Sequence, residues 1–430
     1  MAKTSTETLT QLAANAAKMH PALIDIRRDL HRHPEAGWTE FRTTRIVADR
    51  LRGLGYDVKL GPECIHRNAI RGQPPAAVID ESRRQAGALA DAVEIPGAVG
   101  ILDHGPGPTI ALRFDMDATE VSESTDDNHR PRQEQFASDR PNVMHACGHD
   151  AHVAIGLGVA ELLAEQREWR GKLKLVFQPA EEGGRGAYPM VEAGVVDDTD
   201  YFLSLHIGGP DLRLGDIALE ATHFLSSAKL DANFRGVASH AAGAPQDGRN
   251  ALLAACQAAL ALHALPRHSA GATFVNVGVL NAGSGRNVTA STAEMRFEVR
   301  GATDLICQEM EASARRSIEG AALLQGVQCN IELMGQTIGA ASDRELKDRL
   351  AVVANSLPQQ YRVRDAHPLG GGEDATFFMR RVQERGGKAL YFLLGANSVA
   401  GHHAATFDLD ERALEHGATL FAGMVLSLTQ

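Results

Sequence analysis

The amino-acid sequence predicts an α/β fold into which a second, smaller domain is inserted. In the first half, apolar strands alternate with helices, as where "TIALRFDMDA" is followed by "DAHVAIGLGVAELLAEQ", and this is the pattern of an α/β domain. Between about 223 and 338 the predicted order becomes strand, helix, two strands, helix and strand, the βαββαβ order of a ferredoxin-like unit. The first pattern then returns. We therefore expect one domain over residues 1–222 and 339–430 and another over 223–338.

The N-terminal elements follow from apolar spacing and helix breakers. Apolar residues recur at helical spacing from Ile24 to Leu54, and Pro34 and Gly37 divide this stretch into two predicted helices. Residues 64–96 combine a Pro/Gly turn with a surface helix, so we expect an insertion before the next strand. The segments "GKLKLVFQPAEE" and "YFLSLHIGG" then predict two further strands.

The remaining elements complete both domains. Long helices are predicted near 249–264 and 303–325, inside the inserted domain. After it, "KALYFLLGANSVAGHH" predicts a strand and a loop, and "DERALEHGATLFAGMVLSL" predicts a closing helix.

Composition narrows the possible partners and compartments. The chain has 430 residues, 44% of them hydrophobic and 23% charged, with a formal net charge of −11. This balance disfavours nucleic acids and anionic membranes as partners. The N-terminus lacks a long apolar core and no apolar run approaches membrane-span length, so we expect a cytoplasmic protein. The five cysteines are widely spaced without a C-x-x-C pair, which disfavours a disulfide framework and a structural zinc ribbon.

Potential metal ligands follow four of the predicted strands. The carboxyl ends of strands in an open α/β sheet form the edge where ligands bind. A lone aspartate there often caps a helix, and a lone histidine is often an ordinary surface or core residue. Those explanations would have to hold at every one of these places, which favours a shared site. The side chains are Asp115 with Asp117, Glu181 with Glu182, His206, and His403 with its neighbour His402.

The stretch "MHACGHDAH" precedes a predicted helix and adds further ligands. Cys147 and His149 have a spacing that suits an irregular loop donating a thiolate and an imidazole to one ion. A nucleophilic cysteine activated by His149 is the alternative, but it leaves no role for the glutamate pair or the later histidines. Asp150 is expected to cap the helix or to support the ligands. His145 and His152 have no assigned role.

The adjacent carboxylates in "FQPAEEGGRGA" predict a division of roles. Neighbouring residues on an extended loop point in different directions, so one glutamate can bind metal while the other faces substrate. A metal-bound water has a pKa of about 7 to 9, and a nearby glutamate can take its proton and pass it to a departing amine. The alternative is a solvated acidic loop, but the flanking proline and glycines keep the loop short. The pair therefore predicts amide hydrolysis.

Several motifs together resemble the M20 metallopeptidase family, in its amidohydrolase branch. They are "DLHRHPEAGWTEFRTT", "LRFDMDA", "MHACGHDAHVAIGLG", "VFQPAEEGGRGA", "VASHAAGAPQDGRNALLAA", "NAGSGRNV" and "GGGEDATFFM". The long insertion and the stretch "VSESTDDNHRPRQEQFAS" are similar to the subgroup that hydrolyses p-aminobenzoyl-glutamate and indole-3-acetyl-aspartate. The resemblance implies a zinc-peptidase-like catalytic domain with an inserted ferredoxin-like lid and dimerisation domain.

The resemblance also implies a centre of two divalent metal ions, for which zinc, manganese and cobalt are the candidates. Cys147 is the implied bridge between the ions. We assign the last ligand to His403 rather than His402, because the family places it four residues before the aromatic that is Phe407 here. The implied ligands are Cys147, His149, Glu182, His206 and His403.

Other roles are implied in the same way. Glu181 is the general base and then the general acid, and His240 in "GVASHAAG" matches a histidine that stabilises the oxyanion in a neighbouring subunit's active site. Side chains that could bind the substrate's free carboxylate are Arg286, Asn287 and Arg300. Those that could support the site are Asp115, Asp117, Asp150, Glu373 and Asp374.

These observations predict a metal-dependent amidohydrolase that cleaves an N-acyl or N-aroyl amino acid with an acidic amino-acid half. One alternative is an aminoacylase or a hippurate- or dipeptide-type hydrolase with the same dinuclear centre. Another is a subunit that needs a homologous partner. We expect a homodimer, with such a heteromer as the alternative.

Overall fold

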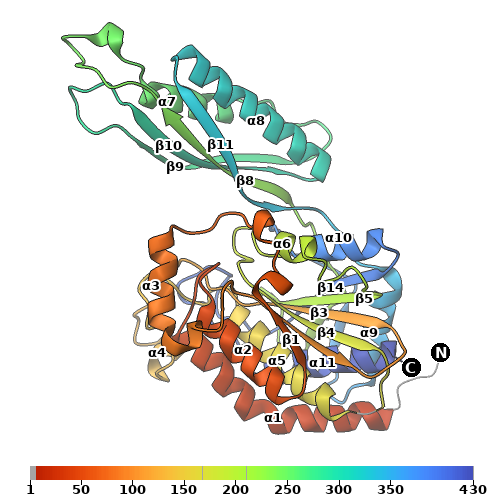
Figure 1. Ribbon diagram of the computed structural model, residues 1–430. Helices are drawn as coiled ribbons and strands as arrows, with labels where there is room; N and C mark the ends of the chain where they lie inside the picture. The colour runs from red at the N-terminus through yellow and green to blue at the C-terminus, as the bar shows by residue number, and fades with distance from the viewer. Residues whose placement is uncertain (1–5, 167, 210, 430) are drawn as a thin grey trace.

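The computed structural model describes residues 6–166, 168–209 and 211–429, and it shows two domains joined by a narrow neck (Figure 1). The larger domain is built on an eight-stranded sheet. From one edge to the other its strands are β1 (Asp57–Leu60), β2 (Ala98–Asp103), β4 (Lys172–Gln178), β3 (Thr109–Asp115), β5 (Tyr201–Ile207), β14 (Lys388–Leu394), β6 (Asp216–Ala218) and β12 (Arg362–Arg364). The four central strands are mutually parallel, so their carboxyl ends share one edge.

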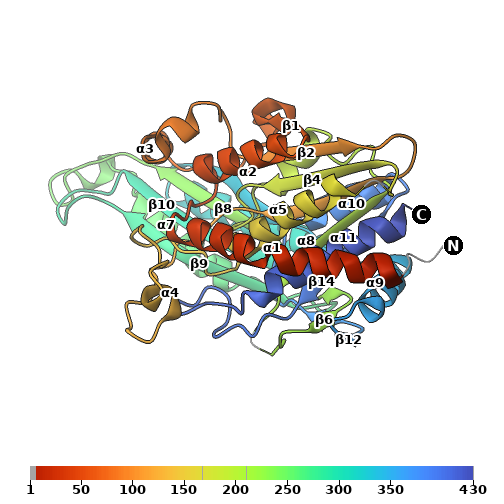
Figure 2. The same cartoon turned by 90° about the horizontal axis from the view of Figure 1, so that it is seen from below.

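One face of this sheet is covered by long helices, as Figure 2 shows from below. They are α1 (Thr6–Arg32), α2 (Phe41–Gly53), α5 (His149–Glu165), α9 (Arg344–Ser356) and α11 (Arg412–Leu428). Helix α5 packs closely on β3 because Gly156 faces Phe114, where an added Cβ would lie 2.7 Å from the ring. This close contact holds α5 against the sheet, so that the segment "CGHD" at the start of the helix lies at the edge of the sheet.

The opposite face carries α6 (Ala187–Glu192) and α10 (Thr376–Glu384), with Phe202 and Phe378 stacked between sheet and helix. The expected insertion forms η2 (Arg67–Ala69), α3 (Ala76–Ala86) and η3 (Gly87–Ala90), and α3 packs beside α2. Shorter elements are η1 (Gly61–Glu63), α4 (Arg130–Gln133) and the two-stranded sheet of β7 (Ala221–Thr222) and β13 (His367–Pro368).

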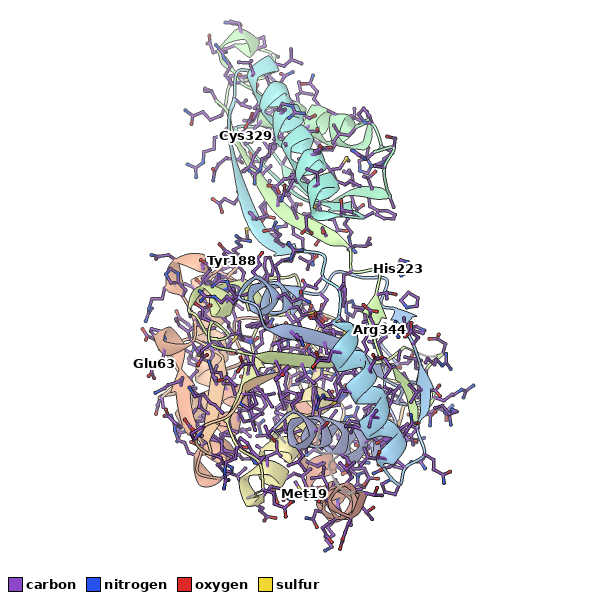
Figure 3. All side chains as sticks on the ribbon, turned by 90° about the vertical axis from the view of Figure 1, so that its right-hand side faces the viewer. Met19, Glu63, Tyr188, His223, Cys329 and Arg344 are labelled. Atoms are coloured by element: carbon purple, nitrogen blue, oxygen red, sulfur yellow. The ribbon has the colours of Figure 1, made fainter. Side chains whose placement is uncertain are left out.

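The inserted domain has the predicted ferredoxin-like order. It consists of β8 (Ser226–Arg235), α7 (Ala251–His263), β9 (Thr273–Ala282), β10 (Thr292–Gly301), α8 (Asp304–Leu324) and β11 (Gln328–Thr337), with η4 (Pro245–Asp247) before α7. The sheet order is β11-β8-β10-β9, and both helices pack on one face. Strands β8 and β11 lead back to the larger domain, near the labelled His223 (Figure 3).

The structure thus confirms the predicted fold class. Among the described helices, none combines the length and apolar character that crossing a bilayer requires. All five cysteines are free thiols.

Candidate metal centre

The carboxyl edge of the parallel strands gathers most of the predicted ligands. Two groups of three side chains place their ligand atoms within 4.8 Å of one another, and both contain Cys147. One group adds His149 and Glu182, and the other adds His206 and His402. Cys147 is therefore common to two sets of potential ligands.

The imidazoles of His149 and His206 are oriented by hydrogen bonds from their Nδ1 atoms. His149 Nδ1 lies 2.8 Å from the Asp117 carbonyl oxygen, and His206 Nδ1 lies 2.7 Å from that of Ile207. Because Nδ1–H donates to a carbonyl, Nε2 is left as the metal-binding lone pair. Within the described structure His149 Nε2 is buried without a hydrogen-bond partner, and His206 Nε2 lies 3.5 Å from Cys147 Sγ.

Asp117 holds the glutamate pair in place. One of its carboxylate oxygens accepts from the backbone N–H of Glu181 and the other from that of Glu182, both at 2.9 Å. Ala180 and Gly183 flank the pair with φ of 49° and 94°, so the loop turns sharply directly after β4. The backbone carbonyl of Asp117 also accepts the hydrogen bond from His149 Nδ1. Asp117 therefore positions three residues of the site.

The two later histidines have different neighbours. His403 Nε2 lies 3.0 Å from Glu182 Oε1, and its backbone N–H donates to Ala146. His402 stacks against His206 at a centroid distance of 4.7 Å and donates from Nε2 to the Ile207 carbonyl at 3.0 Å. His402 therefore belongs to the ligand group of Cys147 and His206, whereas the predicted ligand His403 lies outside both groups with Cys147 and contacts Glu182.

Glu181 occupies a buried, acidic environment. Its carboxylate lies within 4.8 Å of those of Glu373 and Asp374. Burial, reinforced by the charges of Glu373 and Glu182, raises the pKa of Glu181 well above its ordinary value. A carboxylate with a raised pKa can hold a proton near neutral pH, which is the property that a general acid and base needs.

Arg113 balances this acidic group, and the sequence motifs alone did not identify it as a site residue. It is completely buried and pairs with Asp115 at 2.6 Å, Glu373 at 3.1 Å and Asp374 at 3.3 Å. Glu373 also accepts from the Tyr391 hydroxyl. Arg113 is part of the motif "LRFDMDA". Its role follows from its pairing with Glu373 and Asp374, which are far away in the sequence, so the motif alone does not reveal it.

The other residues of "MHACGHDAH" lie outside the two ligand groups with Cys147. Asp150 is in the first turn of α5, after the Gly148 N-cap, and pairs with Arg27 at 2.9 Å and His31 at 2.8 Å. His152 bonds to Asp115 from Nδ1 at 2.5 Å and accepts the Ile207 N–H on Nε2. His145 is buried with no hydrogen-bond partner among the described residues. The aspartate expected to cap α5 or support the ligands is therefore held by α1 instead.

The predicted residues of the inserted domain are not gathered at this edge. His240, Arg286 and Asn287 are exposed on loops beyond the ends of β8 and β9 that lie farthest from the neck. The His240 segment bridges to Val288, and His240 Nδ1 accepts the backbone N–H groups of Ala242 and Gly243, so Nε2 carries the proton of the neutral ring. Arg300, on β10, forms a bidentate pair with Glu298 at 3.0 Å.

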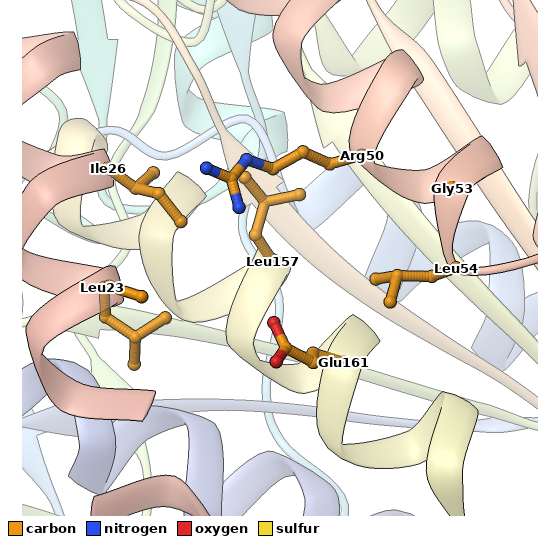
Figure 4. Close-up of a pocket in the computed structure, with 8 residues that line it drawn as sticks. Leu23, Ile26, Arg50, Gly53, Leu54, Leu157 and Glu161 are labelled. Carbon is orange, nitrogen blue, oxygen red and sulfur yellow. The ribbon is translucent and has the colours of Figure 1, made fainter. Parts of the chain in front are cut away.

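The donor set fits divalent metal ions. Thiol, imidazole and carboxylate ligands suit zinc and related ions. Burial, with the charge of Glu182, raises the pKa of the Cys147 thiol, and a bound cation deprotonates such a thiol. A separate surface pocket between α1, α2 and α5 contains none of the predicted site residues; Leu23, Arg50 and Glu161 are among its lining residues (Figure 4).

An α/β sheet that brings these potential ligands together beside a buried glutamate is the arrangement that a hydrolase of the metallopeptidase class requires. The model of peptidase family M20/M25/M40 matches residues 111–427, and the chain belongs to this family. The family resemblance, the fold class and the predicted class of metal-dependent amide hydrolase are thus confirmed.

Similar proteins extend over nearly the whole chain. Indole-3-acetyl-aspartic acid hydrolase of Enterobacter agglomerans is 46% identical over 406 residues, 92% of this chain and 93% of that protein. One of the subunits of p-aminobenzoyl-glutamate hydrolase of Escherichia coli K12 is 44% identical over 422 residues, 95% of each chain.

Solved structures show the same relationship. An aminobenzoyl-glutamate utilization protein from Klebsiella pneumoniae superposes with a TM-score of 0.81 at 38% identity, covering 97% of this chain and 98% of its own. A dinuclear metal-binding peptidase of the M20 family from Bacillus subtilis gives a TM-score of 0.65 at 26% identity, covering 96% and 99%. Divalent metal ions are therefore the cofactor class of this fold.

Proposed function

We propose that the chain hydrolyses the amide bond of an N-acyl or N-aroyl amino acid whose amino-acid half is acidic. The observation that carries this proposal is the pairing of Glu181 with the ligand cluster. A buried glutamate with a raised pKa adjoins Glu182, and Glu182 lies among the proposed ligands. The subgroup of similar proteins, whose names specify p-aminobenzoyl-glutamate and indole-3-acetyl-aspartate, supports the substrate class.

The proposed ligands are Cys147, His149, Glu182, His206 and His403, with Asp115 and Asp117 as supporting residues. Two ions bound there would lower the pKa of a bound water and polarise the substrate carbonyl. Their identity stays among zinc, manganese and cobalt.

In the proposed cycle the chain's residues handle the protons and the charge. Glu181 accepts a proton from the attacking water as the new C–O bond forms. His240 of a neighbouring subunit donates a hydrogen bond to the developing oxyanion. Glu181 then passes its proton to the amide nitrogen, and the C–N bond breaks to give a carboxylic acid and a free amino acid. Arg286 and Asn287 are proposed to bind the carboxylate of the amino-acid half.

The position of His240 supports action between subunits. Strand β8 runs from the neck at Ser226 to Arg235, a length of about 30 Å at the rise of an extended chain, and His240 lies beyond its far end. A second chain could bring this loop to the site. Edge strand β9 of the inserted domain would offer an apolar surface for it, because this strand exposes Phe274 and Val279.

Substitution of Glu181 tests the reaction. We expect Glu181→Ala to bind metal at the wild-type ratio, measured by elemental analysis, while kcat for p-aminobenzoyl-glutamate falls by about 100- to 10,000-fold, the range for loss of a general acid and base. Glu192→Ala removes an acidic side chain from nearby α6 and should change neither value. An active Glu181→Ala protein would refute the assignment.

A partner-dependent chain is the second candidate, because one similar protein is named as a subunit of its hydrolase. The chain purified alone distinguishes the two. A homodimer should be active alone, whereas a partner-dependent chain should be inactive until a homologous chain is added. Assays with p-aminobenzoyl-glutamate, indole-3-acetyl-aspartate and hippurate, with each metal added back, also separate the proposed substrates from an aminoacylase specificity.

A further inference from the structure

In the inserted domain, the face of the sheet that α7 and α8 do not cover is directed toward the loop that contains Glu181 and Glu182. Gly335 of β11 contacts this loop so closely that an added Cβ would lie 2.0 Å from the Gly183 carbonyl oxygen. The direction in which a Cβ at Gly335 would point identifies the face of the sheet that is directed toward the candidate metal centre. It is the face that α7 and α8 leave uncovered, since those helices pack on the other side over Ala228 and Leu230.

Lys229 lies on the same face. It is the direct cross-strand partner of Gly335, and the side chains of directly opposed residues point to the same side of a sheet. Its sequence neighbours Ala228 and Leu230 point the other way, into the core. The charge of Lys229 acts on both Glu182 and His403, so its ammonium group lies within electrostatic range of these two proposed ligands.

Lys229 is also a cation without a partner. Its ammonium group forms no hydrogen bond or ion pair with any residue that the structure describes, and the side chain is half-buried. Two arginines on this face are neutralised locally: Arg300 pairs with Glu298 at 2.9 Å, and Arg296 pairs with Glu294 at 2.6 Å. Arg235 shares the face but lies at the opposite end of β8, away from the neck.

An acidic substrate needs such a cation. The floor of the site is strongly acidic, and the whole chain has a net charge of −11, so a second carboxylate on the substrate is repelled unless a local positive charge receives it. Lysine suits this position because its ammonium is a compact charge on a flexible stem.

We infer that Lys229 binds the side-chain carboxylate of the substrate's acidic amino-acid half and so determines the preference for glutamate- or aspartate-type substrates. This inference rests on the proposed function. Lys229 would bind a different carboxylate from Arg286 and Asn287. Those two residues are proposed to bind the carboxylate that all N-acyl amino acids share.

The test compares p-aminobenzoyl-glutamate with p-aminobenzoyl-glutamine, which has nearly the same shape without the side-chain charge. We expect wild type to prefer the glutamate substrate. In Lys229→Met, kcat/KM for that substrate should fall by about 10- to 100-fold, mainly through KM, as expected for loss of a charge-assisted hydrogen bond. The value for the glutamine substrate should change little, and Lys229→Arg should recover part of the preference.

Arg316→Met is the matched control, since it removes the same charge from exposed α8 on the covered side of the same domain. It should leave both substrates unchanged. An equal fall for both substrates in Lys229→Met, or an unchanged preference, overturns the role of Lys229 while leaving the proposed function intact. A wild-type enzyme that hydrolyses neither substrate overturns the proposed function and the inference with it.

Discussion

His402 and His403 are adjacent in sequence, yet their imidazoles make different bonds. His403 Nε2 already faces Glu182 at 3.0 Å, and two ligands of one ion commonly lie within hydrogen-bond distance when they converge. His402 uses Nε2 to donate to a backbone carbonyl, which is typical of a supporting residue. We therefore expect His403→Ala to lower the metal content from two ions per chain toward one, whereas His402→Ala retains both ions.

Elemental analysis of both variants after dialysis against a weak chelator measures this difference. His367→Ala, in a half-buried histidine that pairs with Asp211, serves as the control and should keep both ions. If His402→Ala loses an ion and His403→Ala does not, the ligand is His402. The assignment of His403 from its spacing to Phe407 is then wrong.

The sequence predicts those parts of the centre that lie in short motifs. Cys147 with His149, and Glu181 with Glu182, are close in sequence, so residue type and spacing identify them before any fold is known. Arg113 and Lys229 could not be found in this way. The role of Arg113 depends on Glu373, which is 260 residues away, and the direction of Lys229 depends on strand register.

At the level of elements, a buried ionic cluster ties three helices together beneath the centre. Arg27 of α1 binds Asp150 of α5 at 2.9 Å, Asp408 at 2.8 Å and Glu411 at 3.1 Å, the last two directly before α11. Burial alone would raise the pKa of Asp408, but the charge of Arg27 and a hydrogen bond from Arg130 lower it to about 2. The folded state therefore favours the ionised carboxylate.

This lowered pKa fixes the sign of a pH dependence. A group with a lowered pKa contributes its full stability above its unfolded pKa of about 4 and loses it as the pH falls toward about 2. We expect Asp408→Asn to reduce the free energy of unfolding by about 2 to 4 kcal/mol at pH 7. The difference from wild type should shrink between about pH 4 and pH 2.

Urea unfolding at a series of pH values measures both effects. Asp49→Asn is the control, because Asp49 pairs with Arg45 at the surface of α2, where ion pairs contribute about 0 to 1 kcal/mol. An Asp408→Asn protein as stable as wild type at pH 7 would show that the cluster does not stabilise the helix packing.

Elements differ in how far the sequence determines them. Helices α2, α5 and α11 have apolar faces with helical spacing, and the central strands are continuous apolar runs, so these elements are predicted. Helices α9 and α10 are not predicted. Strands β1, β6 and β12 have only 4, 3 and 3 residues, too few to show a period. They exist because a neighbouring strand supplies their hydrogen bonds, which is a property of the assembled sheet.

At the scale of the whole molecule, the neck separates His240 from the glutamate of its own chain, and this makes a prediction about two chains together. If His240 acts on a neighbouring subunit, a Glu181→Ala chain still offers a working His240, and a His240→Ala chain still offers a working Glu181. Each variant alone should be nearly inactive. When the two are mixed and their subunits exchange, half of the dimers are mixed and each contains one complete site, so about one quarter of wild-type activity should return.

Exchange between the two variants is the control for this recovery. Activity should be absent when the proteins are mixed and assayed before their chains redistribute, because each dimer then still lacks either both histidines or both glutamates. Mass-tagged chains show when redistribution is complete. A mixture that stays inactive after that point would place the action of His240 within its own chain, and would require the inserted domain to fold down over its own metal centre.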